Sequence, residues 1–132
     1  MLTVKNNRAK EQGSVIKCLL LSILIGCVVF LILLSIAAIA VTFSNVGLEQ
    51  LKYLLYIILP LSVFASALFN GYKTRQLKGI LSGIISAALT VLLLGAVILI
   101  ANRANIDTSS LFIFPLSMII GIPAGILGAN LR

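Results

Sequence analysis

Side chains that could act as acids, bases or nucleophiles are scarce in this sequence. The 132 residues include no histidine and only three acids, Glu11, Glu49 and Asp107. All three acids lie outside the apolar runs. General acid–base catalysis requires a positioned proton donor or acceptor, and proton-coupled transport requires an ionisable group within the membrane. We therefore expect neither an enzyme nor a proton-coupled exporter.

Thiols and hydroxyls do not supply the missing chemistry. Cys18 and Cys27 lie in one apolar run, where a helix would point them to opposite faces about 13 Å apart along its axis. Such a pair can neither form a disulfide nor share a metal ion. The serines of the apolar runs have no base near them in sequence, so we interpret them as small packing residues. No catalytic residue, metal site or cofactor is predicted.

Composition indicates the medium in which the chain folds. Hydrophobic residues make up 61% of the sequence and charged residues 10%, whereas soluble proteins are about half apolar and one quarter charged. A short soluble chain could not bury this excess. The surplus apolar surface is expected to face a lipid bilayer.

Four charge-free apolar runs are long enough to cross a bilayer. A hydrocarbon core of about 30 Å takes about 20 helical residues, and the runs lack the apolar–polar alternation of a membrane β-barrel. The predicted spans are 17–43, 52–70, 78–101 and 110–130. The fold class is therefore all-α, an integral membrane bundle of four antiparallel transmembrane helices. Residues 1–14 form a basic tail, and residues 15–132 form the single transmembrane domain.

Turn and capping residues agree with these spans. Residues 44–47 predict a turn after the first helix, and Asn70-Gly71 is expected to loosen the end of the second. Asp107 and the hydroxyl residues after it are expected to cap the fourth helix. The connections are only about eight residues long, so consecutive helices should be antiparallel neighbours.

Positive charge indicates the orientation of the bundle. Eight of the ten Lys and Arg residues fall on one side: in the N-terminal tail, at the starts of the first and third spans, in the loop between the second and third spans, or at the C terminus. Because cytoplasmic flanks are enriched in cations, both termini are predicted to be cytoplasmic. A net charge of +7 would suggest nucleic acid in a soluble protein, but topology accounts for it here, and no nucleic-acid partner is expected.

Some of these cations are candidates for contact with anionic lipid. A cation close to an anionic membrane surface gains about 1 kcal/mol. Positive-inside topology alone would also place them there. The four candidates are Lys17, Lys73, Arg75 and Lys78.

Small residues recur at helical spacing in the third and fourth spans. Such residues let helix backbones approach closely, which matters in lipid because helices gain little from hydrophobic burial against each other. We expect the third and fourth helices to make the tightest contact, either within one chain or between subunits. The predicted packing residues are Gly79, Gly83, Ser117, Gly121, Gly125 and Gly128.

Pro60 lies inside the second predicted span and Pro123 inside the fourth. Pro60 and Pro123 each remove a backbone donor and disturb the carbonyl four residues earlier. Both are hinge candidates, and the alternative is a static kink that neighbouring helices satisfy.

Three segments resemble a known family. Phe69–Lys73, Leu77–Gly83 and Gly121–Leu131 look like the corresponding parts of uncharacterised four-span bacterial membrane proteins of the YrzE type. The resemblance implies a four-helix architecture and a bacterial plasma membrane, and it implies no activity. The chain departs from the family pattern where glycines of the second helix are replaced by Ser62, Ser66 and Asn70.

Two functional hypotheses follow. The first is a non-enzymatic accessory or assembly subunit, or a small homo-oligomer, that acts through helix contacts of Gly121, Gly125 and Gly128. The alternative is a small oligomeric channel or transporter for a small solute. Its polar lining would consist of Ser62, Ser66, Asn70 and Thr90. The bilayer and a membrane-protein partner or further copies of the chain are the expected partners.

Overall fold

A computed structural model describes residues 1–45, 47–74, 78–101 and 108–131 of the chain. These residues form helices and short turns, and no strand occurs among them. The helices are α1 (Leu2–Ser44), α2 (Leu48–Lys73), α3 (Gly79–Ala101), α4 (Thr108–Leu111) and α5 (Ile113–Asn130). Four of them, all except α4, are long and apolar enough to cross a membrane. The predicted all-α membrane fold is confirmed, and the apolar helices contact the lipid bilayer.

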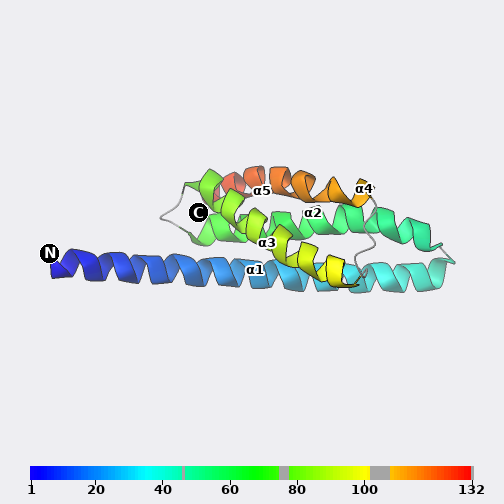
Figure 1. Cartoon of the computed structure of the whole chain (residues 1–132), viewed down its shortest axis with the longest axis horizontal. Coiled ribbons are helices and arrows are strands. Elements are labelled where there is room, and N and C mark those ends of the chain that lie inside the picture. Colours follow the sequence, from blue (N-terminus) through cyan, green and yellow to red (C-terminus); the bar gives the residue numbers. More distant parts are fainter. Residues whose placement is uncertain (46, 75–77, 102–107, 132) are drawn as a thin grey trace.

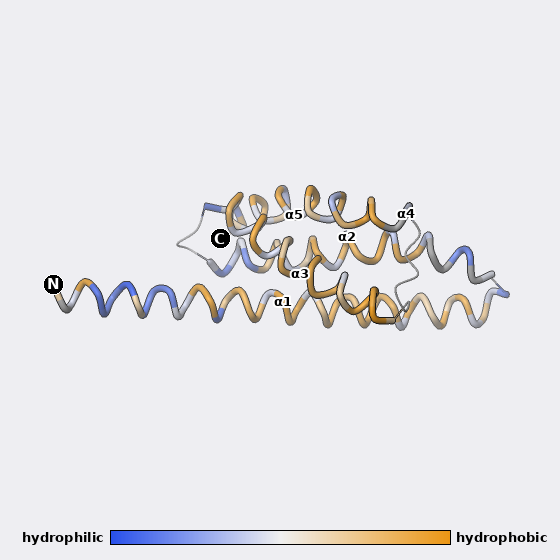
Figure 2. Tube along the Cα trace, in the orientation of Figure 1, coloured by the Kyte–Doolittle hydropathy of each residue, from blue (hydrophilic) through white to orange (hydrophobic). Residues whose placement is uncertain are grey.

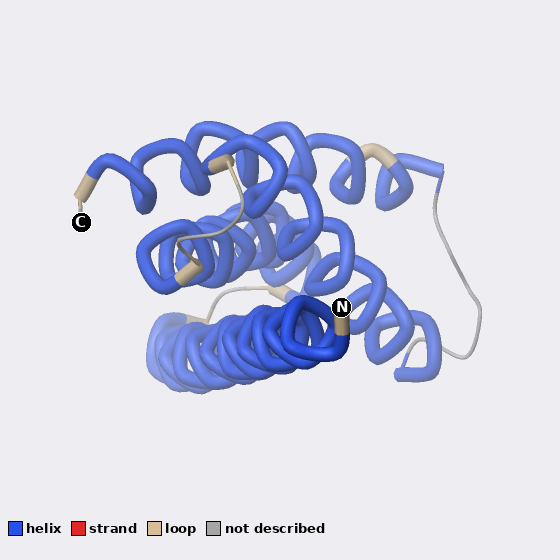
Figure 3. The backbone as a smooth tube through the Cα atoms, turned by 90° about the vertical axis from the view of Figure 1, so that its left-hand side faces the viewer, coloured by secondary structure: helices blue, strands red, loops and turns tan. Residues whose placement is uncertain are grey.

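The four long helices alternate in direction. The N terminus, the C-terminal end of α5, the end of α2 and the start of α3 all lie at one end of the bundle (Figure 1), which we call the terminal end. In the view along the bundle, α2 lies between α1 and α5, and α3 covers one flank (Figure 3). Accordingly α5 packs against α2 and α3, whereas α1 contacts α2 and, less extensively, α3. Helix α1 is therefore the outermost helix of the bundle.

Helix α1 begins well before the predicted start of the first span. Its 43 residues would extend about 65 Å at 1.5 Å per residue, roughly twice the thickness of a hydrocarbon core. The excess is the hydrophilic N-terminal part, which projects past the other helices (Figures 1 and 2). The basic tail is thus helical, because the membrane-spanning part supplies the nucleus from which a helix can extend.

The ends of the helices test the predicted turns. Helix α1 ends at Ser44, and Asn45 adopts the left-handed conformation with φ of 50°, which confirms the predicted turn. The Asn70-Gly71 pair, which was expected to loosen the end of the second helix, lies in the last turn of α2. Helix α2 continues to Lys73 and closes where the Thr74 N–H donates to the Asn70 carbonyl oxygen at 2.9 Å. Asp107 lies outside the described residues.

The fourth predicted span divides into two helices. Helix α4 ends at Leu111 and α5 begins at Ile113. Pro115 explains the break, because its ring has no N–H to donate to the Leu111 carbonyl and would clash with it in a continuous helix. In the first turn of α5 the missing donor costs little.

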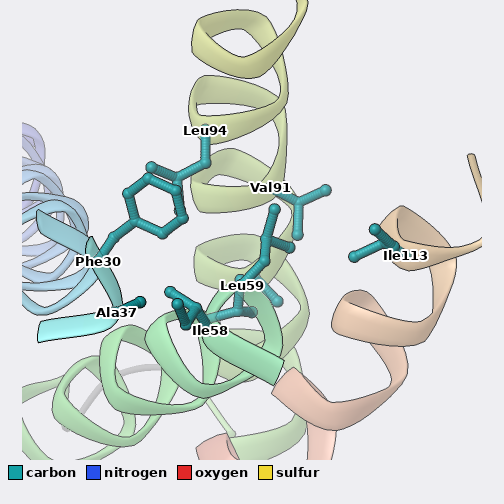
Figure 4. Close-up of a cluster of buried hydrophobic side chains, with 9 residues drawn as sticks. Phe30, Ala37, Ile58, Leu59, Val91, Leu94 and Ile113 are labelled. Carbon is teal, nitrogen blue, oxygen red and sulfur yellow. The ribbon is translucent and has the colours of Figure 1, made fainter. Parts of the chain in front are cut away.

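The half of the bundle away from the terminal end has an apolar interior. All four long helices contribute to one cluster of buried hydrophobic side chains (Figure 4). In lipid such a cluster is held by van der Waals contact between well-packed side chains rather than by exclusion of water. Its members include Phe30, Ala37, Ile58, Leu59, Val91, Leu94 and Ile113.

Candidate functional site

The half of the bundle nearer the terminal end has a polar interior between α2 and α3. We call this group the polar seam; it consists of Ser62, Ser66, Asn70 and Thr74 on α2 and its cap, and Ser82, Ser86 and Thr90 on α3. Every member is buried. The seam is the most concentrated group of polar side chains in the described interior, so it is the candidate functional site.

Two hydrogen bonds of the seam join α2 to α3. The hydroxyls of Ser66 and Thr90 share a hydrogen bond of 2.9 Å. The side-chain amide of Asn70 donates to the backbone carbonyl of Ser82 at 3.1 Å. Asn70 is held in turn by Thr74, whose hydroxyl donates to the Asn70 side-chain oxygen at 2.8 Å. Hydrogen bonds between membrane helices contribute about 0.6 to 2 kcal/mol each, so the seam fixes the register of the two helices.

The other seam hydroxyls mostly bond within their own helices. Ser62 donates to the carbonyl of Leu59 at 2.7 Å, and Ser86 donates to the carbonyl of Ser82 at 2.9 Å. Ser82 Oγ is buried and has no hydrogen-bond partner in the described part of the chain. All seven groups are neutral, and the hydroxyls of Ser62 and Ser86 are bonded to backbone carbonyls, which suits a structural role better than proton transfer.

Glycines bring α3 and α5 into backbone contact beside the seam. Gly83 and Gly125 face each other so closely that a Cβ on Gly125 would contact the Gly83 Cα and lie 2.6 Å from the Gly79 carbonyl oxygen. A Cβ on Gly121 would contact Ala87. Ser117 is buried on the same helix and donates to the carbonyl of Ile113 at 2.7 Å. The structure thus brings five predicted packing residues, Gly79, Gly83, Gly121, Gly125 and Ser117, into the interior or the interface of these helices.

The remaining predicted packing residue, Gly128, faces a different helix. A Cβ there would contact the carbonyl oxygen of Leu68 and lie 3.0 Å from the Tyr72 nitrogen, both on α2. Gly71 makes the reciprocal approach to the Gly125 carbonyl oxygen. The expectation that the third and fourth spans make the tightest contact is therefore wrong, because α5 packs against α2 more extensively than against α3.

The sequence analysis missed a glycine at which three helices meet. A Cβ on Gly26 of α1 would lie 2.9 Å from the Ser66 Cβ on α2 and 3.1 Å from the Thr90 Cγ2 on α3. Ser22 and Phe30, four residues to either side, are also buried. The spacing Ser22-x3-Gly26-x3-Phe30 marks one face of a helix and could have identified this contact.

The other predicted site residues do not join the seam as a group. Pro60 is buried in α2 and Pro123 is exposed on α5, and both helices continue through them. Lys17, Lys73 and Lys78 are exposed toward the terminal end, and Arg75 lies outside the described residues. The hinge and lipid-contact roles stay predictions.

Comparison with known proteins gives a family and no activity. No curated protein and no solved structure shows a significant match to this chain. A family match covers residues 15–128, almost to the end of α5. The matched range includes the polar seam and the glycines at which α5 packs against α3 and α2. The chain therefore belongs to the family described as Protein of unknown function (DUF3792).

Proposed function

We propose that this protein is a non-enzymatic membrane subunit that acts by associating with another membrane protein or with further copies of itself. The sequence supplies no histidine and no acid within its apolar runs, which argues against acid–base chemistry in the membrane. The observation that carries the proposal is a face of small side chains on the outer side of α1, the least buried of the four long helices. Only 17% of its most apolar window is buried, against 33% for α3 and α5 and 50% for α2.

The association surface that we propose differs from the one suggested by the glycines. Gly121, Gly125 and Gly128 are covered by α2 and α3 of the same chain, so they are not free to contact a partner. Helix α1 uses Ser22, Gly26 and Phe30 to pack inward. Its opposite face is exposed, and toward the far end of the bundle that face carries small side chains.

Ser35, Ala38 and Thr42 form this small-residue face. They are spaced three and four positions apart, so they lie on one side of α1, and all three are exposed. Ser35 and Thr42 donate to the carbonyls of Leu31 and Ala38 of their own helix, at 2.8 and 2.7 Å. Their hydroxyls therefore place no unsatisfied donor in lipid, and a second helix could approach the backbone closely.

Photo-crosslinking in native membranes tests this proposal. A photo-reactive amino acid at position 38 should capture a second polypeptide, which mass spectrometry identifies as another copy or as a foreign membrane protein. The same group at Leu116, an exposed position of α5, is the control and should capture less. Native mass spectrometry of the gently solubilised protein should show the same stoichiometric complex. A single chain in native mass spectra together with no capture from position 38 would overturn the proposal.

The proposal also covers the family type of the protein, the membrane in which it lies and its orientation there. We infer a protein of the YrzE type in a bacterial plasma membrane, with the terminal end in the cytoplasm and Lys17, Lys73, Arg75 and Lys78 near anionic headgroups. The collection of exposed cations at the terminal end supports this orientation.

The positions of the polar side chains do not favour the channel hypothesis. Ser62, Ser66, Asn70 and Thr90 point into the bundle, where they are buried and bonded to neighbouring groups. Beyond Thr90 the described interior becomes the apolar cluster of Figure 4. A path along the axis of one chain would have to cross that cluster, and an interface between copies would not expose these four residues.

A further inference from the structure

The N-terminal part of α1 extends beyond the other helices at the terminal end (Figure 1). Gly26 of α1 lies level with Thr90 of α3, and α3 begins eleven residues before Thr90, at Gly79. Because α1 and α3 run in the same direction, position 15 of α1 lies level with the start of α3. Residues 2–14 therefore project past the bundle, over about 20 Å at 1.5 Å per residue.

The side of α1 that packs inside the bundle continues along this projecting part. We call it the inner side; within the bundle it carries Ser22, Gly26 and Phe30, which are buried. At 3.6 residues per turn, Val15 lies about three turns before Gly26, and Arg8 lies five turns before it. Val15 is still partly buried, whereas Arg8 is exposed. The projecting part thus presents an uncovered continuation of an established helix contact.

The inner side of the projecting part is both basic and apolar. Arg8 lies at its centre, Val4 lies one turn before Arg8 with 59% of its surface exposed, and Lys5 flanks both. The projecting part holds three cations, Lys5, Arg8 and Lys10, against one acid, Glu11. A surface that combines acidic and apolar side chains would complement this side of the helix.

The helix of the projecting part has little support from the chain itself. Its N-cap residue Met1 makes no side-chain hydrogen bond, and its first turn contains no acid. Asn6, Asn7 and Gly13 are weak helix formers, and Gly13 costs about 1 kcal/mol relative to alanine. Nothing lies within 4 Å of the position of a Gly13 Cβ. Contact with a partner would add the tertiary packing from which most helices in proteins draw their stability.

We propose that the inner side of the projecting part binds a water-soluble protein, through an acidic side chain opposite Arg8 and an apolar side chain opposite Val4. Nucleic acid would leave Val4 uncovered, and its phosphates would repel Glu11, whereas a protein surface can match all three residues. A lipid headgroup at Lys17 is too distant, because Arg8 lies nine positions before Lys17, about 14 Å of helix, and charges are screened over about 8 Å. This inference does not depend on the association proposed for the outer face of α1.

Site-specific photo-crosslinking in intact cells tests the proposal. A photo-reactive amino acid at position 4 should capture a soluble protein, and mass spectrometry should map the cross-link to a segment of that protein with net negative charge. The same group at Asn6 is the control. Asn6 is also exposed but lies about 200° around the helix from Val4, so capture there should be at least fivefold lower.

Two charge reversals on opposite sides of the helix separate contact from general attraction. Arg8→Glu should lower capture from position 4 at least fivefold. Lys10→Glu changes the net charge equally at another exposed position. Because Lys10 lies about 200° around the helix from Arg8, Lys10→Glu should leave capture unchanged.

A further variant guards against loss of the projecting helix. Arg8→Gln removes the charge without adding an acid, and it should also lower capture in protein whose helical circular dichroism matches the parent. Capture of no protein, of nucleic acid or lipid alone, or of a neutral or basic protein segment would overturn the proposal. So would equal losses in Arg8→Glu and Lys10→Glu, or unchanged capture in both Arg8 variants.

Discussion

Ser66 on α2 and Thr90 on α3 share a hydrogen bond of 2.9 Å at the point where Gly26 of α1 packs against both. Three membrane helices therefore meet at the hydroxyls of Ser66 and Thr90, and the absence of a side chain on Gly26 lets α1 approach them closely. In lipid the alternative to this bond is a hydroxyl that turns back to its own helix. The Ser66–Thr90 hydrogen bond favours one register of α2 against α3, whereas the other contacts between these helices depend on the shape of their side chains.

The Ser66–Thr90 pair should show a measurable coupling energy. Ser66→Ala and Thr90→Val should each destabilise the fold. We expect the double variant to be destabilised by less than the sum of the two single effects, and this difference, the coupling energy, should be about 0.6 to 1.7 kcal/mol. Unfolding by denaturing detergent in mixed micelles measures each free energy. Ser35→Ala removes a hydroxyl that is exposed and bonds only its own helix, so the pairing of Ser35→Ala with Thr90→Val should be additive. A coupling near zero for Ser66 and Thr90 would contradict the role given to this bond.

Gly125 should tolerate no side chain. In Gly125→Ala the new Cβ would overlap the Gly83 Cα and the Gly79 carbonyl oxygen, so α3 and α5 must move apart. Overpacking of this kind costs typically 1 to 3 kcal/mol, measured by the same unfolding experiment. Gly13→Ala is the matched control because nothing lies within 4 Å of its Cβ position. It should leave stability unchanged or raise it by up to about 1 kcal/mol, since alanine favours helix.

The helices could be predicted from the sequence because their cause is local. Charge-free runs of the right length specify membrane helices, and the expected spans agree with α2, with α3 and with the C-terminal end of α1 to within a few residues. The break at Phe112 was missed although its cause is also local. Pro115 removes a donor to the Leu111 carbonyl, but its presence alone could not mark the break, because α2 and α5 continue through Pro60 and Pro123.

The partners of the small residues could not be predicted in the same way. Spacing places Gly125 and Gly128 on one face of α5, but which helix covers each depends on how α2 and α3 straddle that face. Asn70 shows the same limit. Its type favours a helix end, but no spacing in the sequence shows that its amide reaches the Ser82 carbonyl on another helix.

Labelling from the two sides of the membrane should reveal the orientation. In a chain with Cys18→Ala and Cys27→Ala, we expect Lys10→Cys and Lys78→Cys to be shielded from an impermeant thiol reagent in intact cells and labelled after the membrane is opened. Gly47→Cys, at the opposite end of the bundle, should be labelled in intact cells. The reverse pattern would show that the terminal end faces outward.

Cations at the membrane surface should retain anionic lipid, and a cation farther out should not. Lys17, Lys73 and Lys78 are exposed near the ends of their spanning segments, where each should contribute about 1 kcal/mol to binding of an anionic headgroup. We therefore expect Lys73→Gln or Lys78→Gln to lower retention of anionic phospholipid about fivefold in native mass spectra, with zwitterionic lipid unaffected.

Lys5 lies twelve positions before Lys17 on the projecting part of α1, roughly 18 Å along the helix. Because charges are screened over about 8 Å at physiological ionic strength, Lys5→Gln should retain as much anionic lipid as the parent. If Lys5→Gln and Lys73→Gln lost the lipid equally, attraction by net charge rather than contact at the bundle end would account for the binding.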